Sequence, residues 1–287
     1  MPEGHTIHRL AKDLSSTLAG APVTAWSPQG RFADGAARLD GHELVHAEAW
    51  GKYLFCDFGI DEVLHVHLGL IGKFRPKRAP IPDPVGAIRL RLENEATAWD
   101  LSGPTRCELV DPSTQDLIVS KLGADPLRRD ADVATARAAF AATIRPVGAM
   151  LLEQTVIAGI GNVYRAEVLF LCGIHPTRPS NTLTDEEFDS IWSETVRLMR
   201  IGLRLGRIVT TDPDEIGVPR SRMAAHDRLY VYHREHCRWC GTPLGTIDVG
   251  GRPISFCPEH QPAPRRPRRR PARPARPARS ARSPRTA

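Results

Sequence analysis

Hydrophobic residues directly behind the N-terminus recur with the period of an α-helix. They would share one face of that helix: Ile7, Leu10, Ala11, Leu14 and Leu18. Thr6 precedes this stripe and has a side chain of the type that caps helix N-termini. We therefore expect a short helix that Thr6 caps.

From about residue 22 to residue 120 the pattern changes to short runs in which apolar and polar residues alternate. The runs that indicate β-strands lie at 43–48, 52–58, 63–68, 88–92 and 96–101. Alternation over such lengths is typical of strands with one face on a core. Residues 1–125 are therefore predicted to form a β-sandwich with flanking helices.

Helical patterns follow in residues 126–226, after a predicted linker at 122–130 that contains a proline. Thr184 and Glu187 have the spacing of a capping box, which predicts the start of a long helix. The polar stretch 207–226 is rich in helix breakers, so we expect a mobile loop there.

Gly159, Gly161 and Asn162 interrupt the apolar segment 151–176. Such glycines mark a tight joint between two helices. They also let a ligand approach the backbone, and the free N–H groups of the following helix favour an anion such as a phosphate. The pattern alone leaves both interpretations open.

Three of the six cysteines cluster near the C-terminus in two close pairs of potential metal ligands. Their spacing is Cys237-x2-Cys240-x16-Cys257-x2-His260. This spacing is typical of a tetrahedral zinc site, with His233 and His236 as competitors of His260 for the fourth position. The sequence between the pairs predicts a hairpin with a Gly-Gly turn. Residues 227–261 are thus expected to form a zinc finger that has almost no core, so that the metal supplies its folding energy.

The formal net charge of +6 originates in the C-terminal tail. Residues 262–287 contain ten arginines and no acidic residue, whereas residues 1–261 carry 29 Lys and Arg against 33 Asp and Glu. We expect this Arg- and Pro-rich tail to be disordered, and to be either a solvated end or a nonspecific tether to polyanions. A nucleic-acid site in the body would be a local basic patch on a slightly acidic surface.

Length and hydropathy limit the class of protein. A chain of 287 residues is long enough for two or three domains. The chain contains no apolar run near the ~20 residues that span a bilayer, and its N-terminus lacks the pattern of a signal peptide. Its richness in Ala, Arg and Pro is typical of GC-rich bacteria. We therefore expect a cytoplasmic bacterial protein that is monomeric and makes no membrane contact.

The first residues suggest an unusual chemistry. Removal of Met1 would leave Pro2 as a secondary amine at the chain terminus, beside Glu3. An amine can attack the C1′ carbon of a sugar and form a Schiff base, and a neighbouring carboxylate can move protons. Because many proteins begin with Pro-Glu, this pair has weight only together with other motifs.

Five motifs connect these observations. They are MPEGHTIHRLA, WGKYLF, HLGLIG, LLEQTVIAGIGNVYRAEVLF, and the pair CRWCGTPLG and GRPISFCPEHQ. In order and spacing they resemble the formamidopyrimidine-DNA glycosylase and endonuclease VIII family over roughly residues 1–261. The resemblance implies a multidomain α+β fold with an N-terminal β-sandwich, a helix-two-turn-helix domain and a C-terminal zinc finger, and DNA bound in the cleft between them.

The resemblance also implies roles for individual residues. Pro2 would be the nucleophile and Glu3 the general acid and base, and Lys52 would complete the catalytic group by contacting a phosphate near the lesion. Asn162 and Arg252 would hold phosphates on the lesion strand.

Three further residues receive roles from the same resemblance. Leu70 would be an apolar wedge that fills the gap left by an extruded base. Arg165 would belong to the DNA-binding set, and Glu167 would support it. The zinc ion on Cys237, Cys240, Cys257 and His260 would be structural.

The implied function is excision of oxidised bases from damaged DNA, double-stranded or single-stranded, followed by strand nicking through β- and δ-elimination. Three departures from the family pattern affect its details: Thr6 replaces a usual glutamate, His260 replaces a cysteine, and GPTRCEL at 103–109 replaces the arginine-phenylalanine loop of the purine-specific branch. The start PEG and the altered loop favour the endonuclease VIII branch and oxidised pyrimidines.

Three alternatives stay open on the sequence. One is a purine-specific, 8-oxoguanine glycosylase of the same family. Another is a non-catalytic protein with this fold that binds damaged DNA. The third is a metal-dependent hydrolase built from the histidines at positions 5, 8, 65 and 67.

Overall fold

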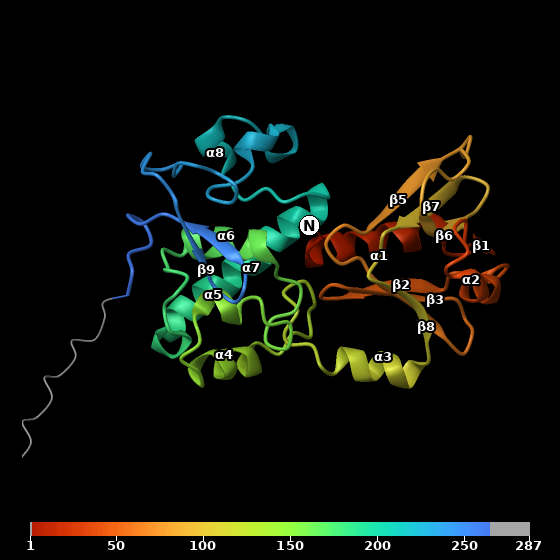
Figure 1. Ribbon diagram of the computed structural model, residues 1–287, viewed down its shortest axis with the longest axis horizontal. Coiled ribbons are helices and arrows are strands. Elements are labelled where there is room, and N and C mark those ends of the chain that lie inside the picture. The colour runs from red at the N-terminus through yellow and green to blue at the C-terminus, as the bar shows by residue number, and fades with distance from the viewer. Residues whose placement is uncertain (1, 265–287) are drawn as a thin grey trace, which may run out of the picture.

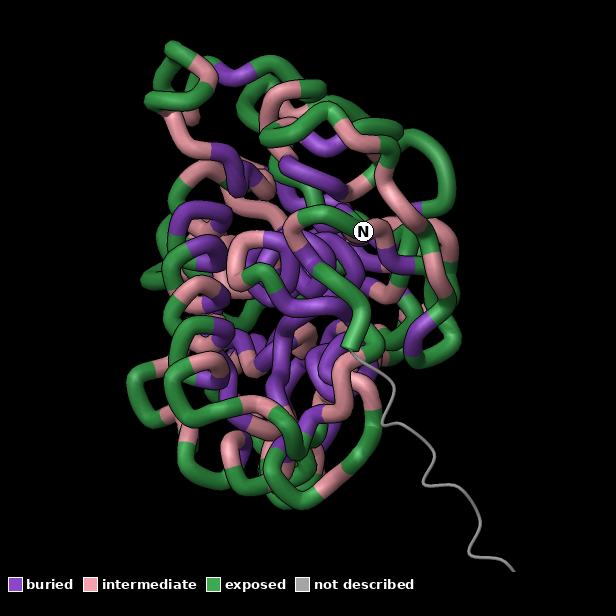
Figure 2. Tube along the Cα trace, turned by 90° about the vertical axis from the view of Figure 1, so that its left-hand side faces the viewer, coloured by how far each residue is buried: buried purple, intermediate pink, exposed green. Residues whose placement is uncertain are grey.

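The computed structural model describes residues 2–264 and builds them around two hydrophobic cores (Figure 1). One core lies within residues 7–101 and the other within residues 124–257. Figure 2 shows the buried segments gathered inside the molecule, with exposed segments around them. The basic tail that we expect to be disordered lies, from residue 265 on, outside the described residues.

Helix α1 (Gly4–Leu18) and two antiparallel four-stranded sheets form the first core. The first sheet has the order β2 (His46–Trp50), β3 (Tyr53–Asp57), β4 (Val63–His67) and β8 (Arg106–Val110). The second has the order β1 (Thr24–Trp26), β6 (Ile88–Glu93), β7 (Thr97–Ser102) and β5 (Lys73–Arg78). Helix α2 (Ala33–Leu39) lies against β1. The predicted sandwich is confirmed.

Three of these strands were not predicted from the alternation of apolar and polar residues, for physical reasons. Strand β1 has three residues, which is too short for alternation to show. Strand β5 lies at a sheet edge, contains Pro76 and buries only Phe74. Strand β8 is half-buried along most of its length.

The predicted cap of the first helix is wrong. Helix α1 begins at Gly4, and Glu3 is its N-cap residue in an extended conformation. The backbone N–H of Thr6 donates to the Glu3 carbonyl at 2.8 Å, so Thr6 lies inside the first turn. The Glu3 side chain makes no capping bond to α1.

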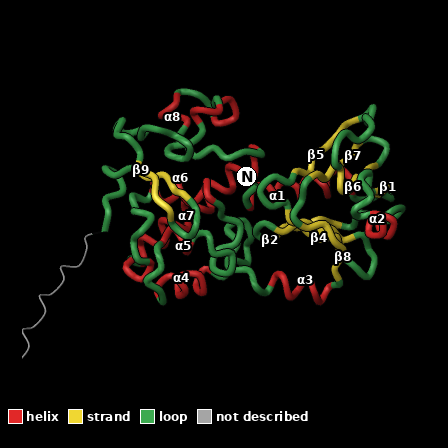
Figure 3. The backbone as a smooth tube through the Cα atoms, in the orientation of Figure 1, coloured by secondary structure: helices red, strands yellow, loops and turns green. Residues whose placement is uncertain are grey.

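The second core is helical, as expected (Figure 3). Its elements are α4 (Val133–Ala141), α5 (Val147–Met150), α6 (Asn162–Leu171), a 3-10 turn (Ser180–Thr182) and α7 (Asp185–Leu205). The capping box of Thr184 and Glu187 is confirmed at the start of α7. Helix α7 packs against both α1 and α6, so it joins the two cores.

The first half of the linker between the cores, residues 122–126, is packed against the helical core, whereas its end is exposed. After α3 (Pro112–Val119), the backbone N–H groups of Gly123 and Ala124 donate to the carbonyls of Gln154 and Val156 at 2.9 and 3.1 Å. Asp125 is only 3% exposed. The linker therefore holds the two cores in a fixed relation.

The stretch 207–226 differs from the expected mobile loop at its beginning. Thr210 and Thr211 are buried, and the Thr211 hydroxyl donates to the Asp227 carbonyl at 2.7 Å. Beyond them the chain forms α8 (Pro213–Ile216) and 3-10 turns at Arg220–Arg222 and Ala225–Asp227. The first residues of this stretch thus belong to the helical core.

The predicted C-terminal hairpin is confirmed. Strand β9 (Gly245–Asp248) pairs antiparallel with β10 (Pro253–Phe256), and Gly250 and Gly251 take positive φ angles at the turn. The expectation that it has almost no core is wrong, since Val249 and Ile254 are buried in the helical core. Within residues 2–264, no helix is long and apolar enough to span a bilayer.

Two glycines bring the start of α1 into contact with the loop before α6. The Gly4 N–H donates to the Gly159 carbonyl at 2.8 Å. A Cβ atom on Gly4 would lie 2.9 Å from the Gly159 Cα and 2.7 Å from the Met199 Cε. A side chain at position 4 would therefore push the two cores apart.

We predict that Gly4→Ala lowers the free energy of unfolding by about 1–3 kcal/mol, because its methyl group overpacks this contact. Chemical denaturation measures the change. Ser16→Ala, at an exposed position of the same helix, is the control and should change stability by less than about 0.5 kcal/mol. Equal stability of Gly4→Ala and the control would contradict the close contact.

Candidate active site

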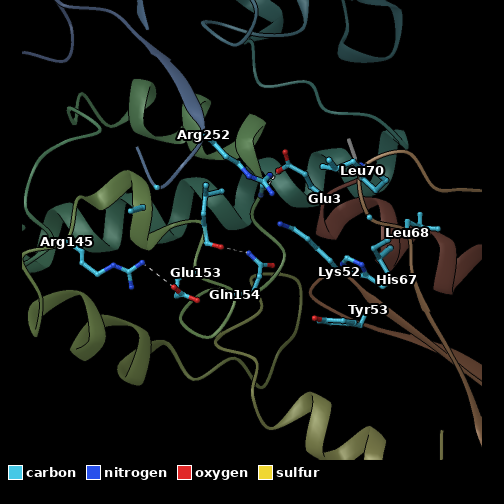
Figure 4. Close-up of a pocket in the computed structure, with 17 residues that line it drawn as sticks. Glu3, Lys52, Tyr53, His67, Leu68, Leu70, Arg145, Glu153, Gln154 and Arg252 are labelled. Atoms are coloured by element: carbon cyan, nitrogen blue, oxygen red, sulfur yellow. Dashed lines mark hydrogen bonds and ion pairs between the residues drawn. The ribbon is translucent and has the colours of Figure 1, made fainter. Parts of the chain in front are cut away.

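A cavity of about 530 Å³ opens where the N-terminus, the sandwich, the helical core and the hairpin meet (Figure 4). Its lining includes five residues that the sequence singled out from distant motifs: Pro2, Glu3, Lys52, Leu70 and Arg252. Other lining residues come from the helical core, among them Arg145, Glu153 and Gln154. The fold thus gathers the predicted nucleophile and two predicted cations around one space.

The Glu3 carboxylate binds the N-terminus of α6. It accepts backbone hydrogen bonds from Gly161 at 2.8 Å, from Val163 at 2.9 Å and from Tyr164 at 3.4 Å. The first N–H groups of a helix lack partners within the helix and favour an anion. The anion at these three N–H groups is therefore a side chain of the protein, so they are not free for a phosphate; the Asn162 N–H is not among them.

This burial also prepares the carboxyl group for proton transfer. Glu3 is 0% exposed. Burial raises the pKa of the Glu3 carboxyl above its ordinary value, and the charge of Lys52 and the three backbone donors oppose that shift. A raised pKa lets a carboxyl group hold a proton closer to neutral pH.

The position of Pro2 is set by the contacts of the two residues that follow it. Glu3 is fixed on α6 and Gly4 on Gly159, so the chain has little freedom before α1. Pro2 is half-buried and lines the cavity. Met1 lies outside the described residues.

Lys52 reaches the same loop from the sandwich. Its Nζ donates to the Ile160 carbonyl at 2.5 Å. Burial lowers the pKa of Lys52 to about 8, the charge of Arg252 adds to this shift, and Glu3 opposes it. The ammonium group therefore begins to lose its charge near physiological pH.

Gln154 is a site residue that the sequence analysis missed. Its amide donates to the Ile160 carbonyl at 3.1 Å and its oxygen accepts from the Gly159 N–H at 3.0 Å. These bonds shape the loop that receives Gly4 and Lys52. The signal for it was a group of three polar residues, at 153–155, between two apolar stretches.

Arg165 is buried and bonded within the protein. Its guanidinium donates to the carbonyls of Gly148 at 3.1 Å, Val249 at 2.6 Å and Arg252 at 3.2 Å. Burial lowers its pKa to about 10. A guanidinium without exposed surface cannot contact a phosphate, which corrects the expectation that Arg165 binds DNA directly. It anchors the hairpin that carries Arg252.

Asn162 lies beside the cavity and not among its lining residues. It is 7% exposed, its amide donates to the Pro253 carbonyl at 2.9 Å, and its oxygen accepts from Arg165. The side chain therefore connects the start of α6 with the hairpin.

Glu167 supports the site from a greater distance. Its carboxylate is fully buried and accepts backbone hydrogen bonds from Tyr230 at 2.7 Å, Val231 at 2.9 Å and Tyr232 at 2.8 Å. Burial raises the pKa of this carboxyl. It fixes the segment that leads into the cysteine cluster.

Leu70 lies on the loop between β4 and β5 and is 62% exposed. Its neighbour Ile71 is 78% exposed. Both side chains line a neighbouring cavity that Pro2 also borders, and adjacent exposed apolar side chains are a feature of binding surfaces. The position of Leu70 is compatible with a wedge.

The four predicted metal ligands converge. The ligand atoms of Cys237, Cys240, Cys257 and His260 all lie within 4.8 Å of one another. In the described chain the buried His260 Nε2 has no hydrogen-bond partner, as expected of a nitrogen that binds a metal. His233 and His236 do not belong to the group. A Cys3His donor set fits a structural zinc ion.

The histidines of the hydrolase hypothesis do not form a metal site in residues 2–264. His5 packs on Tyr164, His8 bonds Asp125, His65 bonds Glu108 and His67 lies against Tyr53. Each ring has a separate partner, so that hypothesis is wrong.

Comparison with known proteins gives a consistent result. Residues 1–108 match the model of the formamidopyrimidine-DNA glycosylase N-terminal domain, and residues 122–214 match that of the formamidopyrimidine-DNA glycosylase H2TH domain. Endonuclease 8 1 of Mycobacterium tuberculosis is 46% identical over 265 residues, which cover 90% of this chain and 98% of that protein. Formamidopyrimidine-DNA glycosylase of Streptococcus pneumoniae is 34% identical over 217 residues, 74% of this chain and 78% of that protein.

Solved structures share the fold. The Lactococcus lactis Fpg protein bound to DNA that contains N7-benzyl-Fapy-dG has a TM-score of 0.76 at 24% identity, covering 91% of this chain and 100% of that one. The same protein in complex with DNA that contains an oxidised pyrimidine gives 0.76 at 25% identity, with the same coverage. Together with the sequence matches, these findings show that the chain belongs to the formamidopyrimidine-DNA glycosylase and endonuclease VIII family of DNA repair glycosylases.

Proposed function

We propose that this protein is a bifunctional DNA glycosylase and AP lyase that removes oxidised bases, chiefly pyrimidines, through a Schiff base on Pro2. The observation that carries the proposal is the placement of Pro2 at a cavity that Glu3, Lys52 and Arg252 also line. A chain terminus held beside a buried carboxyl and two cations has the parts that attack at C1′ requires.

The reaction follows from these positions. The uncharged Pro2 amine attacks C1′ of the damaged nucleotide, the bond from C1′ to the base breaks, and the base leaves with the proton that the Pro2 nitrogen gives up. Glu3, whose pKa burial raises, donates a proton to the ring oxygen O4′, and the opened sugar carries an iminium group.

Strand nicking needs no further reactant. The iminium acidifies the C2′ proton, the Glu3 carboxylate left by the first step takes this proton, and the 3′ phosphate leaves by β-elimination. Loss of the C4′ proton then expels the 5′ phosphate by δ-elimination. Water hydrolyses the remaining imine and restores the Pro2 amine.

The base must leave the helical stack before this chemistry, which costs a few kcal/mol. Lys52 and Arg252 would offset the cost by binding phosphates on either side of the lesion, and Leu70 would fill the vacated space. Glu167 would hold the backbone that carries these groups, and Asn162, whose phosphate contact stays a prediction, would join α6 to the hairpin. We propose a monomer that acts on chromosomal DNA, double-stranded or single-stranded.

The preference for pyrimidines rests on the loop 103–109, which lacks the arginine and phenylalanine of the purine-specific branch. Greater identity to a protein named endonuclease 8 than to proteins named formamidopyrimidine-DNA glycosylase supports the same assignment.

Borohydride trapping with a panel of duplexes tests the function. We expect a covalent protein–DNA adduct and faster excision from thymine glycol and dihydrouracil than from 8-oxoguanine. Glu3→Gln should form at least ~100-fold less product, because the amide cannot donate an acidic proton and its NH2 group would face an N–H donor at the start of α6, while Lys52 and Arg252 retain DNA binding. Exposed Glu43→Gln is the control. Binding of damaged DNA without any adduct would indicate a non-catalytic protein, and fastest excision of 8-oxoguanine would indicate the purine branch.

The lowered pKa of Lys52 predicts a pH dependence of DNA binding. Below pH 8 the amine is protonated and attracts phosphate, whereas above pH 8 it loses this charge. Affinity for a duplex with a tetrahydrofuran abasic analogue should therefore fall as pH rises through 8, by at most tenfold per unit.

Lys52→Arg removes this dependence, since arginine stays charged throughout that range. Fluorescence anisotropy at constant ionic strength measures both proteins. Parallel pH profiles of the two would contradict the role of Lys52 as a titrating phosphate ligand.

We propose that one structural zinc ion binds Cys237, Cys240, Cys257 and His260 and fixes the hairpin. Cys240→Ser or a chelator should weaken DNA binding at least ~10-fold, because Arg252 lies on that hairpin. Trp239 lies between two ligands and packs on His260, so its fluorescence should report loss of the ion. The β-sheet signal in circular dichroism should persist, since the sandwich has its own core. Unchanged DNA affinity of the metal-free protein would overturn this role.

A further inference from the structure

A buried carboxylate outside the cavity connects the two parts of the sandwich that carry reactive groups. Asp125, in the linker, accepts from the His8 Nε2 at 2.8 Å and from the Gly51 N–H at 2.7 Å on the same oxygen. Its other oxygen accepts from the Leu127 N–H at 2.9 Å. The Asp125 side chain is 2% exposed, and it does not line the 530 Å³ cavity.

Two of its donors are closely connected to the site. His8 lies on α1, little more than one turn beyond Glu3, so this bond fixes the helix that sets the direction of Pro2 and Glu3. Gly51 directly precedes Lys52 and turns the chain with a φ of +57°. The Asp125 carboxylate therefore holds both α1, which follows Pro2 and Glu3, and the turn at Gly51, which precedes Lys52.

The residue before Asp125 binds a third segment of the site, the loop that precedes α6. The Ala124 N–H donates to the Val156 carbonyl at 3.1 Å, and the Ala158 N–H donates to the Ala124 carbonyl at 3.0 Å. This segment leads directly into the loop whose Gly159 contacts Gly4 and whose Ile160 accepts from Lys52. The linker thus binds α1, the turn before Lys52 and the loop before α6 at one place.

The chemistry of the position requires a carboxylate. Three donors converge on Asp125, and an ionised carboxylate offers acceptor sites on both oxygens. An asparagine has one acceptor oxygen, so its NH2 group would face at least one N–H donor. The isosteric Asp125→Asn substitution should therefore displace at least one of the segments that donate to Asp125, and it should do so without creating a cavity.

We propose that Asp125 is a positioning residue for the Schiff-base chemistry, which sets the distance from the Pro2 and Glu3 pair to Lys52 from behind the cavity. The inference rests on the proposed function and deepens it. A displacement of about 1 Å at a reacting group can reduce a rate about 100-fold. Asp125 should therefore affect the rate of the chemical step more than it affects DNA affinity.

Single-turnover kinetics test this role. Excess full-length protein is mixed with an abasic-site duplex, and borohydride quenches the reaction at set times. We expect Asp125→Asn to lower the rate constant of adduct formation at least tenfold, with Kd for a tetrahydrofuran duplex within twofold of wild type. Asp130→Asn, which removes an exposed carboxylate from the same linker, should leave both values unchanged.

Variants of His8, which donates to Asp125, keep the test independent of folding. His8→Gln retains an N–H donor for Asp125 and should react at near the wild-type rate, whereas His8→Leu should be as slow as Asp125→Asn. The double variant His8→Leu with Asp125→Asn should be little slower than either single variant, because both substitutions disrupt the same contact, between His8 and Asp125.

The outcomes separate the two proposals. If wild type forms no adduct, the proposed function fails. If wild type reacts and Asp125→Asn reacts at the same rate constant, the positioning role is overturned. A lower amplitude at an unchanged rate constant would also overturn it, since this result describes a smaller folded fraction and no change in the site.

Discussion

The rest of the site depends on one interaction, the hydrogen bonds between the Glu3 carboxylate and the first N–H groups of α6. A helix start needs acceptors for its first N–H groups, and a buried carboxylate needs donors, so each satisfies the other. The bond also crosses from the first core to the second. It fixes Pro2, the proposed terminus of the mature chain, at the wall of a cavity, although chain termini are ordinarily free.

Electrostatics at this place separates the roles of neighbouring groups. Burial favours the neutral forms of both Glu3 and Lys52, while their opposite charges favour the ionised pair. The described body of the chain is slightly acidic overall, yet three cations, Lys52, Arg145 and Arg252, line one cavity that contains two carboxylates, Glu3 and Glu153, of which Glu153 pairs with Arg145. A local positive field inside a body of opposite net charge directs a polyanion to the cavity rather than to the surface at large.

The sequence alone predicted the long periodic elements and the residues whose types define a chemistry. The sandwich, the capping box of α7, the Gly-Gly hairpin and the convergence of the cysteines with His260 follow from spacing. The edge strand β5 did not, because a strand with one buried residue carries almost no hydrophobic pattern.

Contacts between distant segments were beyond sequence reasoning. The segment around Asn162 correctly indicated an anion at the start of a helix, but only the fold shows that the anion is Glu3. The resemblance placed Arg165 among the DNA ligands, whereas its burial under the hairpin depends on tertiary packing. The bonds of Gln154 and Asp125 likewise exist only once the two cores meet.

Mass spectrometry of the borohydride-reduced protein–DNA adduct tests the central claim most directly. After nuclease and protease digestion, the account predicts that the sugar remnant is attached to the nitrogen of Pro2 in a peptide that has lost Met1. A remnant on Lys52 or another lysine, or a fully reactive protein that retains Met1, would contradict it.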